Sequence, residues 1–151
     1  MPRLTQTTVI KHQADDLYEL VRDIRRYPEF IKWINSMSVR QEEATTDHYS
    51  CIGEVAVGFK GFQETFSTRV SANPAKRRID VELDRGPFRH LRNRWQFDVK
   101  SRGVTDVFFF IDYEFKNPLL RLLARTNQSL AVNRIMQAFQ SEADRRYGQT
   151  S

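Results

Sequence analysis

The sequence predicts an α+β fold in which a seven-stranded antiparallel sheet curls around one long C-terminal helix. Residues 37–115 alternate apolar and polar side chains between regular turn signals, which is typical of an antiparallel meander with one buried face. Residues 118–147 then repeat apolar side chains at helical spacing, and a helix of this length can cover that face. The 151-residue length suits a single domain, residues 1–151, with one core.

The first elements are a strand and two short helices. Residues 4–10 are rich in Thr, Val and Ile, as strands are. Residues 14–24 place apolar side chains on one helical face. Pro28 ends this helix, because proline disfavours helical geometry in the residue before it. A second helical turn is predicted over residues 29–34.

Six runs of strand length follow, and turn-forming residues separate them. The turns are predicted at Thr46-Asp47 and at residues 58–61, 73–76, 85–87 and 101–103. The last helix opens with a proline and is followed by Gly148, which suit its two ends. At about 1.5 Å per residue it is long enough to cross the sheet, and such an arrangement tends to leave a hollow for a ligand.

The composition excludes several classes of protein. Aromatic residues make up 12% and charged residues 28%, which indicates a globular chain, and no apolar run is long enough to span a membrane. Cys51 has no second cysteine to pair with, and the N-terminus carries no targeting pattern. We therefore expect a bacterial cytoplasmic protein, with peripheral contact at the inner membrane face. The net charge of +5 is a weak signal of contact with phosphate groups.

The residues that carry chemistry are scattered along the chain. His12, His48 and His90 lie on different predicted elements, without the spacing of metal ligands. Cys51 has no neighbouring base, and no nucleotide-binding or nucleophile motif appears. We therefore predict no metal, no catalytic residues and no enzyme. Glu64 alone among the carboxylates shares the inward parity of its strand, where it can be a base, a ligand anchor or a member of an ion pair with an arginine.

Aromatic side chains give the strongest signal of a binding site. Those with inward parity are Phe62, Phe66, Trp95, Phe97, Phe109, Tyr113 and Phe115. Such a face is either plain core or the lining of an apolar cavity. Small residues on the covering helix, Ala131 and Ala138, leave room for a cavity, so the hypothesis is a site for an apolar ligand.

Two turns place a phenylalanine next to glycine or proline, where burial is hard to arrange. One turn carries Phe59 and Lys60, and the other carries Phe88, followed by Arg89 and Arg92. Apolar tips beside cations suit contact with a membrane surface or a gate to the cavity. Each phenylalanine can equally fold back under its own loop. RNA binding through the sheet is disfavoured, because the aromatics lie mainly on the buried parity, whereas RNA contact through a loop and helix stays open. No DNA contact is predicted.

Short motifs run along the whole chain in one order. They are YPEFIKW at residues 27–33, GFKGF at 58–62, GPFRHL at 86–91, FFIDYEF at 109–115 and the closing pairs Ala138-Phe139 and Tyr147-Gly148. In this order they resemble the coenzyme Q-binding proteins of the START-like, polyketide cyclase and lipid transport superfamily. The chain is also similar to a close branch of ribosome association toxins.

The resemblance implies a helix-grip fold of the START and Bet v 1 type. It also implies a non-catalytic role: the binding of ubiquinone or a similar polyprenyl lipid as a chaperone that supports respiratory electron transport. The residues that the resemblance implies for the cavity are Pro28, Phe30, Trp33, Val55, Phe62, Phe66, Val81, Trp95, Phe97, Phe109, Leu123, Leu130, Ile135 and Phe139. Pro28, Phe30 and Trp33 are expected to shape its mouth. Asn127-Gln128 departs from the expected apolar pattern and suggests a polar anchor for the quinone head.

Two other functions stay open. One is a ribosome-binding inhibitor of subunit association that contacts the large subunit through Arg89, Arg92 and Arg94. The other is a small-molecule cyclase or dehydratase, since the superfamily includes such enzymes, although no inward acid–base pair can be assigned here. We predict the lipid-binding role over both.

Overall fold

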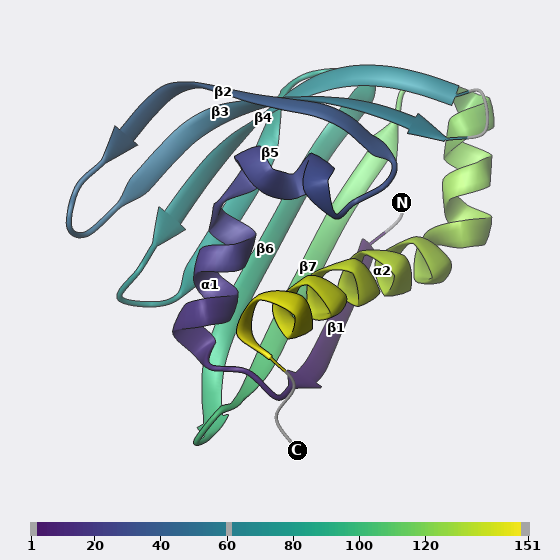
Figure 1. Ribbon diagram of the computed structural model, residues 1–151. Helices are drawn as coiled ribbons and strands as arrows, with labels where there is room; N and C mark the ends of the chain where they lie inside the picture. The colour runs from purple at the N-terminus through teal and green to yellow at the C-terminus, as the bar shows by residue number, and fades with distance from the viewer. Residues whose placement is uncertain (1–2, 60–61, 149–151) are drawn as a thin grey trace.

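One antiparallel sheet forms the framework on which the helices pack (Figure 1). The computed structural model describes residues 3–59 and 62–148, apart from the side chains of Phe59, Phe62 and Asn127. Within this part of the chain, seven strands lie in the order β1-β7-β6-β5-β4-β3-β2. The elements are β1 (Arg3–Ile10), α1 (Ala14–Arg22), η1 (Ile24–Glu29), β2 (Ile34–Ala44), β3 (Tyr49–Phe59), β4 (Phe62–Asn73), β5 (Arg78–Arg85), β6 (Phe88–Ser101), β7 (Val104–Phe115) and α2 (Pro118–Tyr147).

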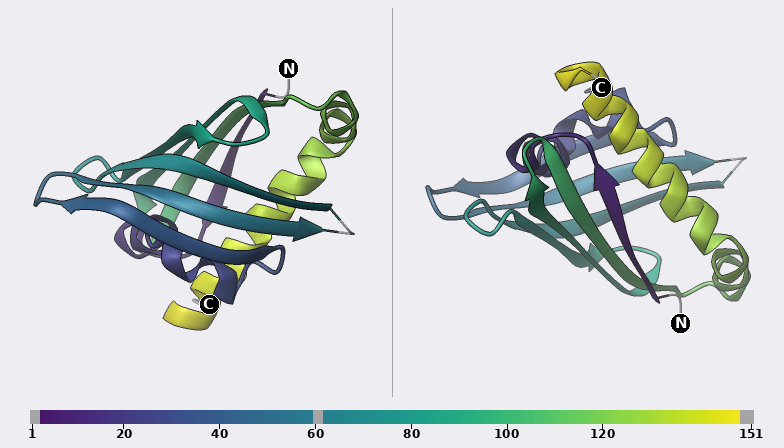
Figure 2. Two further views of the ribbon diagram at one scale, coloured as in Figure 1. Left: turned by 90° about the horizontal axis from the view of Figure 1, so that it is seen from above. Right: turned by 90° about the horizontal axis from the view of Figure 1, so that it is seen from below.

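The predicted fold class is confirmed. The sheet is strongly curved, and α1, η1 and α2 all lie on its concave side, with α2 crossing the open side of the sheet (Figures 1 and 2). α1 packs on β5 and β6, η1 packs on β2, and α2 packs on α1, β7 and β1. The helices therefore cover the apolar face, as the helix-grip arrangement requires.

The strand register places the predicted inward residues on this concave face. Trp95 pairs with both Ile79 on β5 and Phe109 on β7, and Val55 on β3 pairs with Phe66 on β4. Directly paired residues share a face of the sheet. Cys51, on the same face, is buried, and burial raises the pKa of its thiol, so it acts as a small core residue.

The second short helix lies earlier in the chain than predicted. It is a 3₁₀ helix over Ile24–Glu29 that contains Pro28, and the helical turn predicted over residues 29–34 is wrong. Tertiary contacts explain the difference. The hydroxyl of Tyr27 donates to the carbonyl of Val21, and its ring packs edge-on against Phe139 at 5.2 Å, which fixes the turn before the proline.

The long helix has the predicted ends. The side chain of Asn117 accepts hydrogen bonds from the backbone N–H groups of Leu119 (2.8 Å) and Leu120 (3.4 Å), and Pro118 occupies the first turn. Gly148, with a φ of 80°, ends the helix in a conformation that disfavours other residues.

The predicted apolar stripe of α2 is wrong in the first half of the helix. The buried apolar side chains are Val132, Met136, Phe139 and Ala143, which lie from the midpoint of the helix onward. Leu123, Leu130 and Ala131, which the prediction placed in the stripe, are exposed. At about 100° per residue the exposed leucines and the buried set point in different directions, so the predicted stripe combined two faces. The helix also changes direction in its first half (Figure 1).

Candidate ligand-binding site

A tightly packed group of aromatic rings forms the floor of the concave face beneath α1 and α2. Trp95 lies 6.1 Å from Phe97 in a stacked pair, and it meets Phe109 and Phe139 edge-on at 4.8 and 5.1 Å. Phe30 meets Phe139 at 5.3 Å. We call these five rings the inner aromatic group. Trp95, Phe97, Phe109 and Phe139 are buried, and so four of the predicted cavity residues pack against one another as core.

A second cluster of rings lies at the other end of the concave face, where β6 starts and β7 ends. Phe88 stacks on Phe115 at 4.6 Å and meets Phe66 and Tyr113 edge-on at 5.2 and 6.3 Å. We call these four rings the outer aromatic group. Phe115, the last residue of this group, ends β7 shortly before α2 begins at Pro118.

Phe88 is buried, so its ring folds back under its own loop, which is one of the two alternatives that the sequence left open, and does not lie exposed as a membrane contact. Gly86 lets the loop approach Phe66, against which the ring of Phe88 packs, because a Cβ at residue 86 would lie 2.4 Å from the Cβ of Phe66. The other predicted tip cannot be compared: the side chain of Phe59 and all of Lys60 lie outside the described residues.

The predicted arginine cluster lies on the convex face and is largely paired with acids. Arg92 lies 3.5 Å from Asp112, and Arg94 contacts Asp80 at 2.6 Å, while Arg89 is exposed. His90 also contacts Asp112, at 3.0 Å.

Burial alone would raise the pKa of Asp112, but hydrogen bonds from His90 and Arg3 lower it, so this carboxylate is charged. Asp112 is shared by Arg3, His90 and Arg92, so it offsets only part of the local positive charge.

A groove of about 840 Å³ opens between α2 and the corner where η1 leads into β2. It is lined by Phe30, Lys32, Trp33, Gly58, Arg134, Gln137, Ala138, Ser141, Glu142 and Arg145. The backbone N–H of Gly58 donates to the carbonyl of Trp33 (2.9 Å), which holds this corner against the end of β3. Its volume lies within the range of small-molecule sites, about 300–1,000 Å³.

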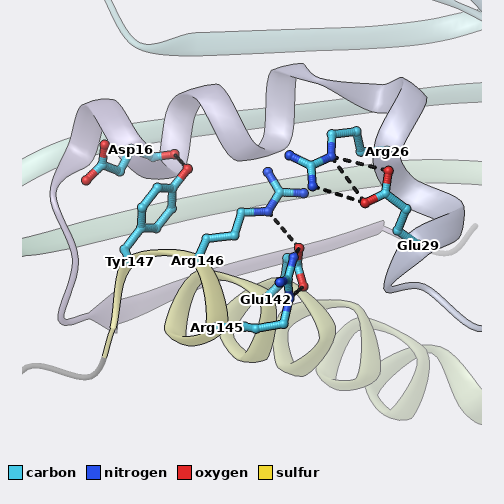
Figure 3. Close-up of polar contacts among 7 residues, drawn as sticks. All are labelled: Asp16, Arg26, Glu29, Glu142, Arg145, Arg146 and Tyr147. Atoms are coloured by element: carbon cyan, nitrogen blue, oxygen red, sulfur yellow. Dashed lines mark hydrogen bonds and ion pairs between the residues drawn. The ribbon is translucent and has the colours of Figure 1, made fainter.

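One end of the groove carries a network of charges (Figure 3). Glu142 is only 5% exposed and accepts hydrogen bonds from Arg145 and Arg146, each at 2.6 Å. These arginines, Arg145 first, lower the pKa of Glu142 to about 2. The guanidinium of Arg146 also lies over the ring of Phe30, 5.6 Å from its centre. The groove thus joins an aromatic wall to a charged rim, where Lys32, Arg134 and Arg145 outnumber Glu142.

Two of the residues predicted at the cavity mouth, Phe30 and Trp33, line this groove, and Pro28 is half-buried in η1 nearby. The other predicted cavity residues lie deeper or elsewhere. Val55 is buried, and Val81 and Ile135 pack against the core.

Several predicted residues do not join the groove. Phe66 belongs to the outer aromatic group, and Leu123 and Leu130 are half exposed rather than closing a cavity. The side chains of Phe62 and Asn127 lie outside the described residues, so the suggested polar anchor stays a prediction.

Sequence reasoning missed the polar lining supplied by α2. The lining residues of this helix are Arg134, Gln137, Ala138, Ser141, Glu142 and Arg145. They recur every three or four residues, which places them on one helical face. This spacing was visible in the sequence, but a search for an apolar stripe does not detect it.

Glu64 lies on the concave face, paired across the strands with Val57, as its parity predicts. It is half-buried. The arginines that the prediction named as ion-pair partners are engaged elsewhere, Arg69 with Asp84 and Arg94 with Asp80. The ion pair of Glu64 that the sequence offered as one alternative is therefore not formed with either of these arginines.

The histidines lie away from the inward strand positions. His12 contacts Asp144 at 2.7 Å beside the end of α2, His90 lies on the convex face, and His48 is exposed in the turn after β2. Across residues 3–59 and 62–148, no three His, Cys, Asp or Glu side chains converge as a metal site would require. No helix in the same part of the chain combines the length and apolarity needed to cross a bilayer.

The family can be assigned from sequence comparison. The model of the family described as polyketide cyclase / dehydrase and lipid transport matches residues 10–140. The chain belongs to this family. It is 30% identical over 148 residues to the ribosome association toxin RatA of Escherichia coli K12, covering 97% of this chain and 90% of that protein. It is 27% identical over 136 residues to the mitochondrial coenzyme Q-binding protein coq10 of Schizosaccharomyces pombe, covering 89% and 82% of the two chains.

Two solved structures have the same fold. The 18 kDa protein CC1736 from Caulobacter crescentus is 34% identical, with a TM-score of 0.82 over 99% of this chain and 100% of its own. A START superfamily protein from Mycobacterium smegmatis shares only 17% identity but has a TM-score of 0.80 over 95% and 97% of the two chains. The helix-grip, START-like fold is thereby confirmed.

Proposed function

We propose that this protein binds a polyprenyl quinone, such as ubiquinone, without chemical conversion, and delivers it to the respiratory chain. The observation that carries the proposal is the groove beside α2, whose aromatic wall of Phe30 and Trp33 adjoins the concave face of the sheet. Its dimensions suit a ring with a short length of tail. The relative named as a coenzyme Q-binding protein supports this choice of ligand.

The energetics of such binding need no catalytic group. Burial of apolar surface contributes roughly 25 cal/mol per Å², so an isoprenoid tail packed beside aromatic side chains supplies the affinity. The polar lining of the groove, including Gln137 and Ser141, offers hydrogen-bond partners for the quinone oxygens. Tail burial and head recognition together account for specificity.

A short-chain ubiquinone titrated into the protein tests the proposal, because quinones quench tryptophan fluorescence and Trp33 lines the groove. We expect saturable quenching in the wild-type protein. Ala138→Phe, which fills the groove, should weaken binding at least about tenfold, the loss expected when one ring's worth of apolar contact is blocked.

Ala131→Phe is the matched control, because Ala131 is exposed on the same helix and does not line the groove. It should bind as the wild type does. Equal binding by Ala138→Phe and the wild type would contradict the assignment of this groove.

A second candidate is the inhibition of ribosomal subunit association, since the RatA relative is named a ribosome association toxin. The convex face offers it limited support, because Arg92 and Arg94 are paired with Asp112 and Asp80. Sedimentation with ribosomal subunits tests it. Binding to the large subunit that Arg89→Glu abolishes, without any quinone binding, would replace the first proposal by the second.

A further inference from the structure

The first half of α2 presents a row of leucines to solvent. Leu119, Leu122, Leu123 and Leu130 are 64%, 59%, 50% and 52% exposed. The spacing of Leu119, Leu122 and Leu123 places these three on one side of the helix. Exposed leucines scattered singly are normal, but three on one helical face make an apolar strip, which we call the leucine face, while Leu130 lies further along the helix, beyond Thr126.

The leucine face is not an extension of the core. The buried residues of α2 begin only at Val132, and they point in another direction around the helix axis. Thr126 lies between the two parts, and its hydroxyl donates to the carbonyl of Leu123 at 3.0 Å. Such bonds from Ser and Thr back to the preceding turn often bend helices. The bend turns this half of α2 away from the second half (Figure 1).

The charge along this stretch of the chain has one sign. Residues 116–141 contain four cations and no Asp or Glu. Lys116 and Arg125 are exposed, and Arg121 donates to the carbonyls of Phe115 and Lys116. A helical segment with an apolar face, nearby cations and no acids is complementary to an anionic lipid surface.

We propose that the leucine face docks the protein onto an anionic lipid bilayer. Aliphatic side chains enter the boundary between headgroups and acyl chains, while Lys116 and Arg125 lie against anionic headgroups. The outer aromatic group ends at Phe115, two residues before Asn117, so docking brings this end of the concave face to the membrane. The inference adds a membrane partner and does not depend on which lipid the protein binds.

Sedimentation of the full chain with vesicles tests this inference. Vesicles of phosphatidylcholine with phosphatidylglycerol should bind the wild-type protein more strongly than vesicles of phosphatidylcholine alone. Leu119→Ser combined with Leu122→Ser should reduce binding at least about tenfold, since two apolar side chains are lost from the bilayer. Arg125→Glu should reduce binding to the anionic vesicles about fivefold or more.

The opposite end of β7 supplies the controls. Val99 is 61% exposed near the β6–β7 turn, and Arg102 is exposed within that turn. Val99→Ser and Arg102→Glu should leave vesicle binding unchanged. Quenching by short-chain ubiquinone should be unchanged in all these variants, which separates this inference from the proposed function.

Two results would overturn the inference. One is undiminished vesicle binding by the folded Leu119→Ser, Leu122→Ser protein. The other is a wild-type protein that binds neither kind of vesicle. If that protein binds ribosomal subunits and the same two substitutions abolish this binding, the leucine face is a ribosome contact.

Discussion

Glu142 both lines the groove and stabilises the fold through its ion pairs. Its carboxylate is buried at the end of the groove between Arg145, which is exposed, and Arg146, which is mostly buried. Removing the carboxylate leaves the guanidinium of Arg146 buried without its charge partner, which is costly. Sequence reasoning did not identify this carboxylate as a site residue, because the charges at the end of α2 have the pattern of an ordinary solvated helix face.

Glu142→Gln should lower the free energy of unfolding by about 3 kcal/mol, measured by urea denaturation at neutral pH. Glu29→Gln is the control, because the Arg26–Glu29 pair is exposed, and it should leave stability nearly unchanged (Figure 3). The pKa of Glu142 is lowered from 4.5 to about 2. Its stabilising effect is therefore complete above about pH 4.5 and is lost as the pH falls toward 2. An unchanged urea midpoint in Glu142→Gln would refute this role.

Gly86 and Gly53 both lie against a side chain, but with different freedom to adjust. A Cβ at residue 86 would meet the Cβ of Phe66 at 2.4 Å, whereas one at residue 53 would meet the flexible end of Ile24 at 2.6 Å. Gly86→Ala should therefore destabilise the protein by about 1–3 kcal/mol and disturb the outer aromatic group. Gly53→Ala should cost less. Thermal unfolding and the near-ultraviolet circular dichroism of both variants check this, and equal losses would contradict it.

The helix α2 lines the groove, and its two halves differ in burial: the leucines of the first half are exposed, whereas apolar side chains of the second half pack in the core. The sequence predicts its ends correctly, because Pro118 and Gly148 are local signals. It does not predict which face is buried, because a bend inside the helix changes the direction that each face points. The same limit applies to η1, where contacts of Tyr27 with distant residues decide the position of the turn.

The first half of α2 should open more readily than the second half. Leu119, Leu122 and Leu123 are exposed, whereas Met136 and Phe139 are buried, so fewer apolar contacts hold the first half. Amide hydrogen exchange should be faster in residues 119–126 than in residues 132–143. Asn117→Ala, which removes the cap at a cost of about 1 kcal/mol, should speed exchange in the first half alone. Equal protection of both halves would contradict this account.

At the scale of the whole molecule, period-two alternation was sufficient to predict the sheet. The inward positions of β5, β6 and β7 follow the parity of the sequence, because a strand in a one-sided sheet can bury only alternate residues. Phe88 is an exception, since a register shift between Phe88 and His90 changes the parity at the start of β6. The site was less predictable. Parity identifies inward aromatics but not which of them pack against one another, so Trp95 and Phe97 belong to the core while Trp33 reaches the groove.

The central claim is that the groove beside α2 gives access to a bound polyprenyl quinone, and extraction of the purified protein tests it most directly. Wild-type protein, the Ala138→Phe variant and the Ala131→Phe control are extracted with organic solvent, and bound quinone is quantified by mass spectrometry. We predict quinone near one molecule per chain in the wild type and the control, and little in Ala138→Phe. Equal quinone in all three proteins, or none in wild-type protein even after incubation with quinone-loaded vesicles, would contradict the claim.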